Sequence, residues 1–425
     1  MKLKKLTAVL TAVILAAALA GCEPGGESYT DNSSGKAASS ESTAQPETDE
    51  SSQPEKQPET DEEWEQAMLD KAMVSYGNTV LVQNVINKAQ SGEEVTLAYL
   101  GGSITEGISA GPEDCYAKLS YDYFAEKFGT GDNVKYHNAG LSGTPSKLGV
   151  LRLDRDVLSA DPDLVFIEFA VNDGTEPEYR NAYESIVQTL LKKNIAVVLL
   201  FSVTESDHSA QDYMKEIGEA YRLPMISYCD ALRYLFENDR MTWQDFSDDQ
   251  SHPNYEGHKL VASMIDYYFD TVMDVPAEGD YVMPIEPVNS PREVDAHMYE
   301  NDTLTPVETG SWREGSTIAS FDKGWTHEDS AGNDPIVFEM DAKFVYMIFK
   351  EVQSGPYGKL HVKVTADGEV YDETDYDTVS PSGWGNAQVQ NIAMMPSVTH
   401  YRIEISMAEG EEETFGQLLG FGYTT

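Results

Sequence analysis

Hydrophobic residues between positions 63 and 273 follow two alternating patterns. Short apolar runs rich in β-branched and aromatic residues occur at 95–100, 133–137, 164–170, 195–203 and 224–228. Between them lie longer stretches with helical spacing, at 114–128, 145–158, 177–193 and 209–222. Further helices are expected over 63–91, with a break at Gly77-Asn78, and from Pro253 through Tyr268. This alternation predicts a doubly wound, flavodoxin-like parallel sheet with helices on both faces, in a domain spanning 63–280.

The pattern changes after Met273. Residues 281–306 are rich in Pro, Asp and Glu and are expected to form a linker. From 307 to 425 the apolar runs at 336–349, 359–366, 399–407 and 415–423 are typical of strands, and Asp367-Gly368 predicts a hairpin turn. These features predict a C-terminal antiparallel β-sandwich domain.

The N-terminus has the pattern of an export signal. Three lysines within the first five residues precede an apolar run from Leu6 to Ala20, which is short for a membrane span. Leu19-Ala20-Gly21-Cys22 resembles the lipobox of bacterial lipoproteins, which implies removal of residues 1–21 and lipidation of Cys22. The alternative is a plain signal peptide with an incidental cysteine. We expect a protein anchored to the outer face of the bacterial cell membrane.

Residues 22–62 have the composition of a disordered acidic tether. After position 22 they contain no Leu, Ile, Val or Phe before residue 63, so they cannot bury enough apolar surface to offset the entropy lost on ordering. The whole chain carries a formal charge of −44 from 29 basic and 73 acidic residues. Such an acidic chain is repelled by phosphates, which excludes nucleic acid as a partner.

Four polar turns follow strands of the predicted sheet or precede its last helix. The first contains Ser103, directly after two glycines, and the others are Asn138–Gly143, Ala170–Gly174 and Asp249–Asn254. In doubly wound sheets the carboxyl ends of the strands form one rim, where ligands bind. The sequence therefore predicts that these four turns meet at a single site.

In this order, and across roughly 95–273, the four turns resemble the blocks of the SGNH hydrolase (GDSL-type esterase/lipase) family. The resemblance implies that Ser103 is the nucleophile and that His252 is the general base. It implies that Asp249 orients the imidazole and that the Gly140 backbone N–H and the Asn172 amide stabilise the oxyanion. The Ser103 backbone N–H is expected as a third donor. The sequence departs from the family pattern at Gly102, where Asp is common, at Ile104-Thr105, which replace Leu and its neighbour, and at Ala170, where Gly is common. None of these changes removes a catalytic group, so they bear on the expected subfamily and substrate and not on the reaction.

The chemistry of these residue types supports the same roles. A serine hydroxyl needs a base within hydrogen-bond reach, and a carboxylate must hold that imidazole in the correct tautomer. Asp249 is the preferred carboxylate because it stands three residues before His252, while Asp248 and Asp245 are alternatives. Serine chemistry requires no cofactor, and the spacing of the histidines and cysteines predicts no metal site.

These inferences predict a surface-tethered serine esterase that hydrolyses short acyl esters, acetyl esters above all, on carbohydrate. One alternative is a lipid or thioester acyl hydrolase. Another is a non-catalytic surface protein that binds carbohydrate on a hydrolase scaffold. In the β domain, Trp384 lies in a Gly-rich loop that is able to present its indole face to a sugar, although packing against the esterase domain is the preferred interpretation.

Overall fold

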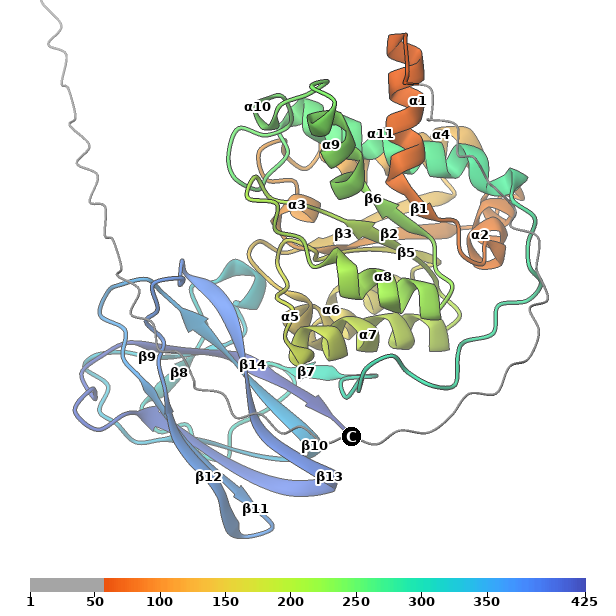
Figure 1. Cartoon of the computed structure of the whole chain (residues 1–425). Coiled ribbons are helices and arrows are strands. Elements are labelled where there is room, and N and C mark those ends of the chain that lie inside the picture. The colour runs from red at the N-terminus through yellow and green to blue at the C-terminus, as the bar shows by residue number, and fades with distance from the viewer. Residues whose placement is uncertain (1–56) are drawn as a thin grey trace, which may run out of the picture. The chain divides into compact units, whose positions relative to one another are not determined.

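A computed structural model describes residues 57–425, and the predicted signal peptide, Cys22 and most of the tether lie outside this range. The first sheet has the strand order β1-β6-β5-β4-β2-β3, in which only β1 is antiparallel (Figure 1). Its strands are β1 (Met73–Ser75), β2 (Val95–Gly101), β3 (Val134–Gly140), β4 (Leu164–Glu168), β5 (Ala196–Phe201) and β6 (Met225–Ser227). Counted along the chain, the five parallel strands have the flavodoxin-like order 2-1-3-4-5. This arrangement confirms the predicted doubly wound sheet.

Helices cover both faces of this sheet because side chains of a strand alternate between its faces. Leu97 and Tyr99 of β2 pack with one helical layer, whereas Ala98 and Leu100 pack with the other. The first layer comprises α1 (Asp61–Ala72), α2 (Val80–Gln90), α4 (Tyr116–Phe128), α9 (Tyr228–Glu237) and α11 (Tyr255–Thr271). The second comprises α5 (Ser146–Leu151), α6 (Leu153–Asp156), α7 (Pro177–Lys192) and α8 (Gln211–Ala220). Two single-turn helices are α3 (Ser103–Glu106) and α10 (Trp243–Phe246), and 3-10 turns occur at η1 (Leu158–Ala160), η2 (Val272–Asp274) and η3 (Ala319–Phe321).

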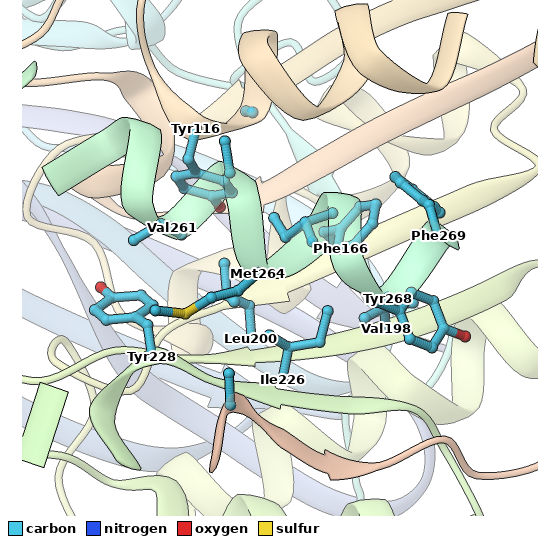
Figure 2. Packing of buried hydrophobic residues seen from close by; sticks show 14 of the residues in the cluster. Tyr116, Phe166, Val198, Leu200, Ile226, Tyr228, Val261, Met264, Tyr268 and Phe269 are labelled. Atoms are coloured by element: carbon cyan, nitrogen blue, oxygen red, sulfur yellow. The ribbon is translucent and has the colours of Figure 1, made fainter. Parts of the chain in front are cut away.

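The core under α11 is made largely of aromatic and long aliphatic side chains. Figure 2 shows Met264 and Phe269 of this helix directed toward the sheet residues Phe166 and Leu200. Phe166 also stacks on Tyr99 of the neighbouring strand, with ring centroids 5.0 Å apart. Because α11 directly follows the turn that carries His252, this packing fixes the position of that turn relative to the sheet.

The second sheet is antiparallel and contains eight strands. The strands are β7 (His297–Tyr299), β8 (Trp312–Glu314), β9 (Trp325–His327), β10 (Ile336–Glu351), β11 (Leu360–Ala366), β12 (Glu369–Tyr376), β13 (Asn386–Met407) and β14 (Gly416–Thr424). Their order is β12-β11-β13-β10-β14-β9-β8, with β7 also paired to β14. The long strands β10 and β13 change register at two irregular points and enclose a separate apolar core. The structure thus confirms the predicted antiparallel β-sandwich.

The two sheets share a hydrophobic core. The cluster formed by α5, α7 and α8 also contains Tyr346 and Ile348 of β10 and Leu419 of β14. The predicted linker is built into this contact: the buried carboxylate of Glu184 accepts hydrogen bonds from the backbone N–H groups of Val288 and Asn289, each at 2.7 Å. Residues 58–425 accordingly form one compact unit. The predicted domain boundaries at 280 and 307 stay predictions.

Several short elements differ from the sequence-based expectation. The predicted helix over 63–91 is interrupted by β1, and α1 begins at Asp61, within the last residues assigned to the tether. β7 lies inside the predicted linker, and β8 and β9 were not predicted. β12 is the second strand of the hairpin predicted at Asp367-Gly368, although its own pattern gave no apolar run. These strands are short or polar, so their pattern alone does not reveal them. Within residues 57–425, none of the helices combines the length and apolar character needed to cross a bilayer.

One buried cation links the ends of two central strands. The side chain of Arg152, which is 1% exposed, donates to the carbonyl oxygen of Gly101 at 3.0 Å and to that of Ala139 at 2.8 Å. It also pairs with Asp156 at 3.1 Å. Gly101 ends the strand before Ser103, and Ala139 lies at the end of β3, so Arg152 fixes the spacing of two of the four polar turns.

We predict that Arg152→Met lowers the free energy of unfolding by about 3 kcal/mol, because two buried carbonyls and a carboxylate lose a charged donor. Urea denaturation measures this change. Arg240→Met is the matched control, since Arg240 pairs with the exposed Asp61 and should cost less than about 1 kcal/mol. Equal losses in the two variants would contradict the role of Arg152.

Candidate active site

The nucleophile turn forms where β2 meets α3. Ser103 is the first residue of α3 and is 9% exposed. Gly102 is required there by a close approach, because a Cβ atom at this position would lie 2.3 Å from Asn172 Oδ1. The departure from the family pattern at position 102 therefore makes room for Asn172. Among the five parallel strands, β2 lies between β3 and β4, at the point where the strand order reverses, and Ser103 follows its end.

His252 lies between the serine and a carboxylate. Its Nε2 atom is 2.8 Å from Ser103 Oγ, and its Nδ1 atom is 2.7 Å from Asp249 Oδ2. An ionised carboxylate only accepts hydrogen bonds, so the proton is on Nδ1, and Nε2 accepts from the serine hydroxyl. This is the arrangement in which imidazole can take a proton from Ser103.

Asp249 is held in the ionised form. Desolvation raises the pKa of its carboxyl. This effect is outweighed by hydrogen bonds from the backbone N–H groups of His252 and Ser251, each at 2.7 Å, and from the imidazole, so the pKa of Asp249 lies below its ordinary value. The alternative Asp245 instead caps α10 through Thr242, and no hydrogen bond or ion pair of Asp248 occurs among the described residues. The structure thus brings Asp249, and neither alternative, to His252.

The predicted role of Gly140 is corrected by the geometry. Its N–H donates to Asn138 Oδ1 at 2.8 Å, and Gly140 is still part of β3, paired with Gly101. Ser103 lies two residues beyond Gly101, so the backbone level with Ser103 comes from the turn after Gly140. Gly143, which has φ of 65°, lines the cavity beside the serine. In the described part of the chain, neither the Gly143 N–H nor the Ser103 N–H makes a hydrogen bond.

A cavity of about 410 Å³ opens over the serine. We call it the active-site cavity, and it is lined by Ser103, Ile108, Ser142, Gly143, Val171, Asn172, Ser251, His252 and Trp384. The Asn172 side chain thus reaches it, with an Oδ1 atom that is buried without a partner and an amide group that makes no hydrogen bond to the described residues. Gly140 does not line this cavity but a separate one.

The β domain supplies one wall of the active-site cavity. The indole ring of Trp384 lies so close to Gly143 that a Cβ atom there would be 1.8 Å from the ring. Trp384 is nevertheless 58% exposed. The residue therefore packs on the α/β domain and also presents part of its ring to the cavity.

Buried polar groups behind the site were not found from the sequence. Glu168 at the end of β4 is fully buried, and burial raises its pKa, whereas the hydroxyls of Ser202 and Thr105 donate to its two oxygens. Thr105 belongs to α3, so Glu168 supports the helix that starts with Ser103. A single Glu at a strand end carries no distinctive sequence signal.

Two buried polar residues near the site have structural roles. Asp173 accepts from the Ser146 N–H and from Tyr213 Oη, each at 2.8 Å, and burial raises its pKa to about 7, so it braces the turn of Asn172. His258 is buried, burial lowers its pKa to about 4, and its Nδ1 accepts from Tyr116 N–H at 3.1 Å. Among the described residues, no group of three or more His, Cys, Asp or Glu side chains is arranged to hold a metal ion.

Comparisons with known proteins support a hydrolase. Residues 99–260 match the model of the GDSL-like Lipase/Acylhydrolase family. The chain is similar to the solved structure of a two-domain esterase (CEX) active on acetylated mannans, alone and co-crystallised with mannopentaose. That similarity has 25% identity and a TM-score of 0.72, over 84% of this chain and 98% of the other. The acetyl xylan esterase AlAXEase aligns with 40% of this chain and 98% of its own, at 24% identity and a TM-score of 0.35. No curated protein sequence matches the chain. The family match over residues 99–260 and the similarity to the two-domain esterase together support a hydrolase of the esterase class.

We predict that Ser103→Ala and His252→Ala each lower kcat for an acetyl ester by about 10⁴-fold or more, and that the double variant is hardly worse, because the two residues act as a unit. Steady-state hydrolysis of p-nitrophenyl acetate measures this. Ser251→Ala is the control: this serine lines the same cavity, and its substitution keeps the N–H that bonds Asp249. Activity above about a tenth of the wild-type value in either single variant would contradict the assignment.

Proposed function

We propose that this protein is an exported serine esterase that removes acetyl groups from carbohydrate. The observation that carries the proposal is the continuous hydrogen-bond chain from Ser103 through His252 to Asp249 at the floor of an open cavity. Ser103 Oγ attacks the ester carbonyl while His252 Nε2 takes the hydroxyl proton. The imidazolium then gives this proton to the sugar oxygen as the C–O bond breaks. Water, activated by the same base, releases acetate from the acyl-enzyme.

The negative oxygen of the tetrahedral intermediate needs preorganised donors, and losing one typically costs about 2.7–4 kcal/mol. We assign this role to the backbone N–H groups of Ser103 and Gly143 and to the Asn172 side-chain amide. Each reaches the active-site cavity and lacks a hydrogen-bond acceptor among residues 57–425. Gly143 thus replaces the predicted Gly140 in this proposal.

Two observations support carbohydrate as the substrate class. The two-domain esterase that resembles this chain over both of its domains acts on acetylated mannans. Trp384 also adds an exposed indole to an otherwise small esterase cavity, and the apolar C–H face of a pyranose can pack on such a ring. The β domain therefore acts in the proposed reaction as part of the substrate site.

A series of p-nitrophenyl esters with acyl chains of increasing length tests this function. We expect kcat/KM for p-nitrophenyl esters to be highest for acetate and to fall along the series to octanoate, and an acetylated oligosaccharide to be a good substrate. In a lipid hydrolase each buried methylene would instead contribute about 0.8 kcal/mol, so kcat/KM would rise with chain length. A steady rise would replace the carbohydrate proposal by the lipid or thioester acyl hydrolase.

We predict that Trp384→Ala raises KM for acetylated oligosaccharides about tenfold, because it removes an aromatic contact of about 1.5 kcal/mol. Hydrolysis of p-nitrophenyl acetate should change by less than threefold. Trp64→Ala is the control, since Trp64 lies on α1 outside the active-site cavity. Equal losses on both substrates would mean that Trp384 supports the site without contacting sugar.

The export and anchoring of the protein form a separate proposal. Residues 1–56 lie outside the described structure, and the proposal rests on the lipobox-like Leu19–Cys22 and the basic, apolar segment before it. A diacylglyceryl group at Cys22 would bury two chains of methylenes, which holds a protein stably on a membrane.

Cys22→Ser should therefore move the protein from the membrane fraction to the medium, or leave an uncleaved precursor, with unchanged esterase activity of the soluble part. Cell fractionation with and without about 1 M salt measures the share of the protein in the membrane fraction, because a hydrophobic anchor resists release by salt. Wild-type protein in the medium, with an N-terminus other than Cys22, would identify a plain signal peptide.

A further inference from the structure

A second cavity lies between the two domains. Some of its lining residues follow those of the active-site cavity closely in the sequence. The second cavity has a volume of about 230 Å³, and we call it the seam cavity. Its polar lining residues are Lys147, Glu178, Glu293, Tyr346, Gln390 and Asn391. The first two come from α5 and α7, and the last two from β13, so neither domain forms this cavity alone.

The same two chain segments border both cavities. Gly143 and Trp384 line the active-site cavity, and four and five residues further along the chain Lys147 and Val389 line the seam cavity. Extended backbone advances about 3.3 Å per residue, so these pairs of lining residues lie within about 17 Å of each other. An extended polymer with one unit at Ser103 can therefore reach the seam cavity with a unit further along.

Several polar atoms of the seam cavity make no hydrogen bond to the described residues. The Lys147 ammonium lies 3.8 Å from Glu178 Oε1 and 4.5 Å from the centre of the Tyr179 ring, and it keeps its hydrogen-bond donors unused within residues 57–425. The amide N–H groups of Gln390 and Asn391 are bonded to backbone carbonyls, at 3.1 and 3.4 Å, and their side-chain carbonyl oxygens accept no bond from residues 57–425. The cavity thus offers an ammonium donor, a carboxylate and two amide acceptors, which match the hydroxyl groups of a sugar.

The charges in the seam cavity select against an anionic ligand. Lys147 is balanced by Glu178, and the carboxylate of Glu293, which accepts from Tyr346 Oη at 2.6 Å, adds a further acidic group. An anionic sugar would meet this acidic lining without an unpaired cation to receive it. A neutral sugar carries no charge for this acidic lining to repel.

From these observations we infer that the seam cavity is a second sugar-binding subsite, which holds a neutral unit of the polymer whose acetyl group is at Ser103. This inference rests on the proposed esterase function and makes the two-domain contact a determinant of substrate length. The acetylated monosaccharide fills only the active-site cavity, whereas a longer oligomer fills both.

The test compares kcat/KM for p-nitrophenyl acetate, an acetylated monosaccharide and a size series of neutral acetylated mannooligosaccharides. For the wild type we expect kcat/KM to rise with oligomer length. Gln390→Ala/Asn391→Ala should raise KM for the long oligomers about tenfold and leave the two small substrates unchanged, because two neutral hydrogen bonds are lost. Lys147→Met, on the other domain, should act in the same direction.

Asn84→Ala/Gln90→Ala is the matched control, since these amides are exposed on α2, outside both cavities. Unchanged hydrolysis of p-nitrophenyl acetate shows that a variant is folded. A wild type that cleaves the acetylated monosaccharide but gains nothing with length, or variants as active as the wild type on long oligomers, would overturn the seam subsite alone. A wild type that cleaves none of the acetyl esters would instead overturn the proposed function.

Discussion

The Arg152 guanidinium holds together the part of the sheet on which the catalytic turns are built. It donates to the last carbonyl of β2 and to the carbonyl of Ala139 in β3, and these strands lead to Ser103 and to Gly143. An oxyanion site requires donors from two chain segments at a separation set within a fraction of an ångström. A buried charge that bonds both segments meets this requirement, since its movement would leave polar groups unsatisfied.

The site has two layers, a partly exposed layer of reactive residues and a buried layer of residues that keep them in position. Glu168, Asp173 and His258 are buried and bonded, and they brace the turns from below. His252 and Asp249 lie on a partly exposed turn anchored by α11, where the imidazole can exchange its proton with substrate. The buried layer keeps the exposed one in position without taking part in the reaction.

Contact between the two domains makes the β domain part of the active-site cavity. Without this contact, its sheet would enclose its own core and expose Trp384 away from the serine. Because Tyr346, Ile348 and Leu419 share a core with the α/β layer, Trp384 is held against Gly143, and the polar end of β13 faces α5. In the proposed reaction this shared core decides how a polymer crosses the site.

Local sequence determined most of the elements and most of the chemistry. The strands β2 to β6 and the helices between them follow from apolar periodicity, and Ser103, Asn172, Asp249 and His252 follow from polar turns at strand ends, because both signals depend on neighbouring residues. The choice between Gly140 and Gly143 does not follow from local sequence, since both glycines belong to the same polar segment. The pairing of Gly101 with Gly140 places Gly140 in the strand, and Gly143 lies at the active-site cavity. The roles of Arg152, Glu168 and Trp384 likewise depend on contacts between segments far apart in the chain. Tertiary structure decided them because a buried charge or a cavity wall is defined by what packs around it.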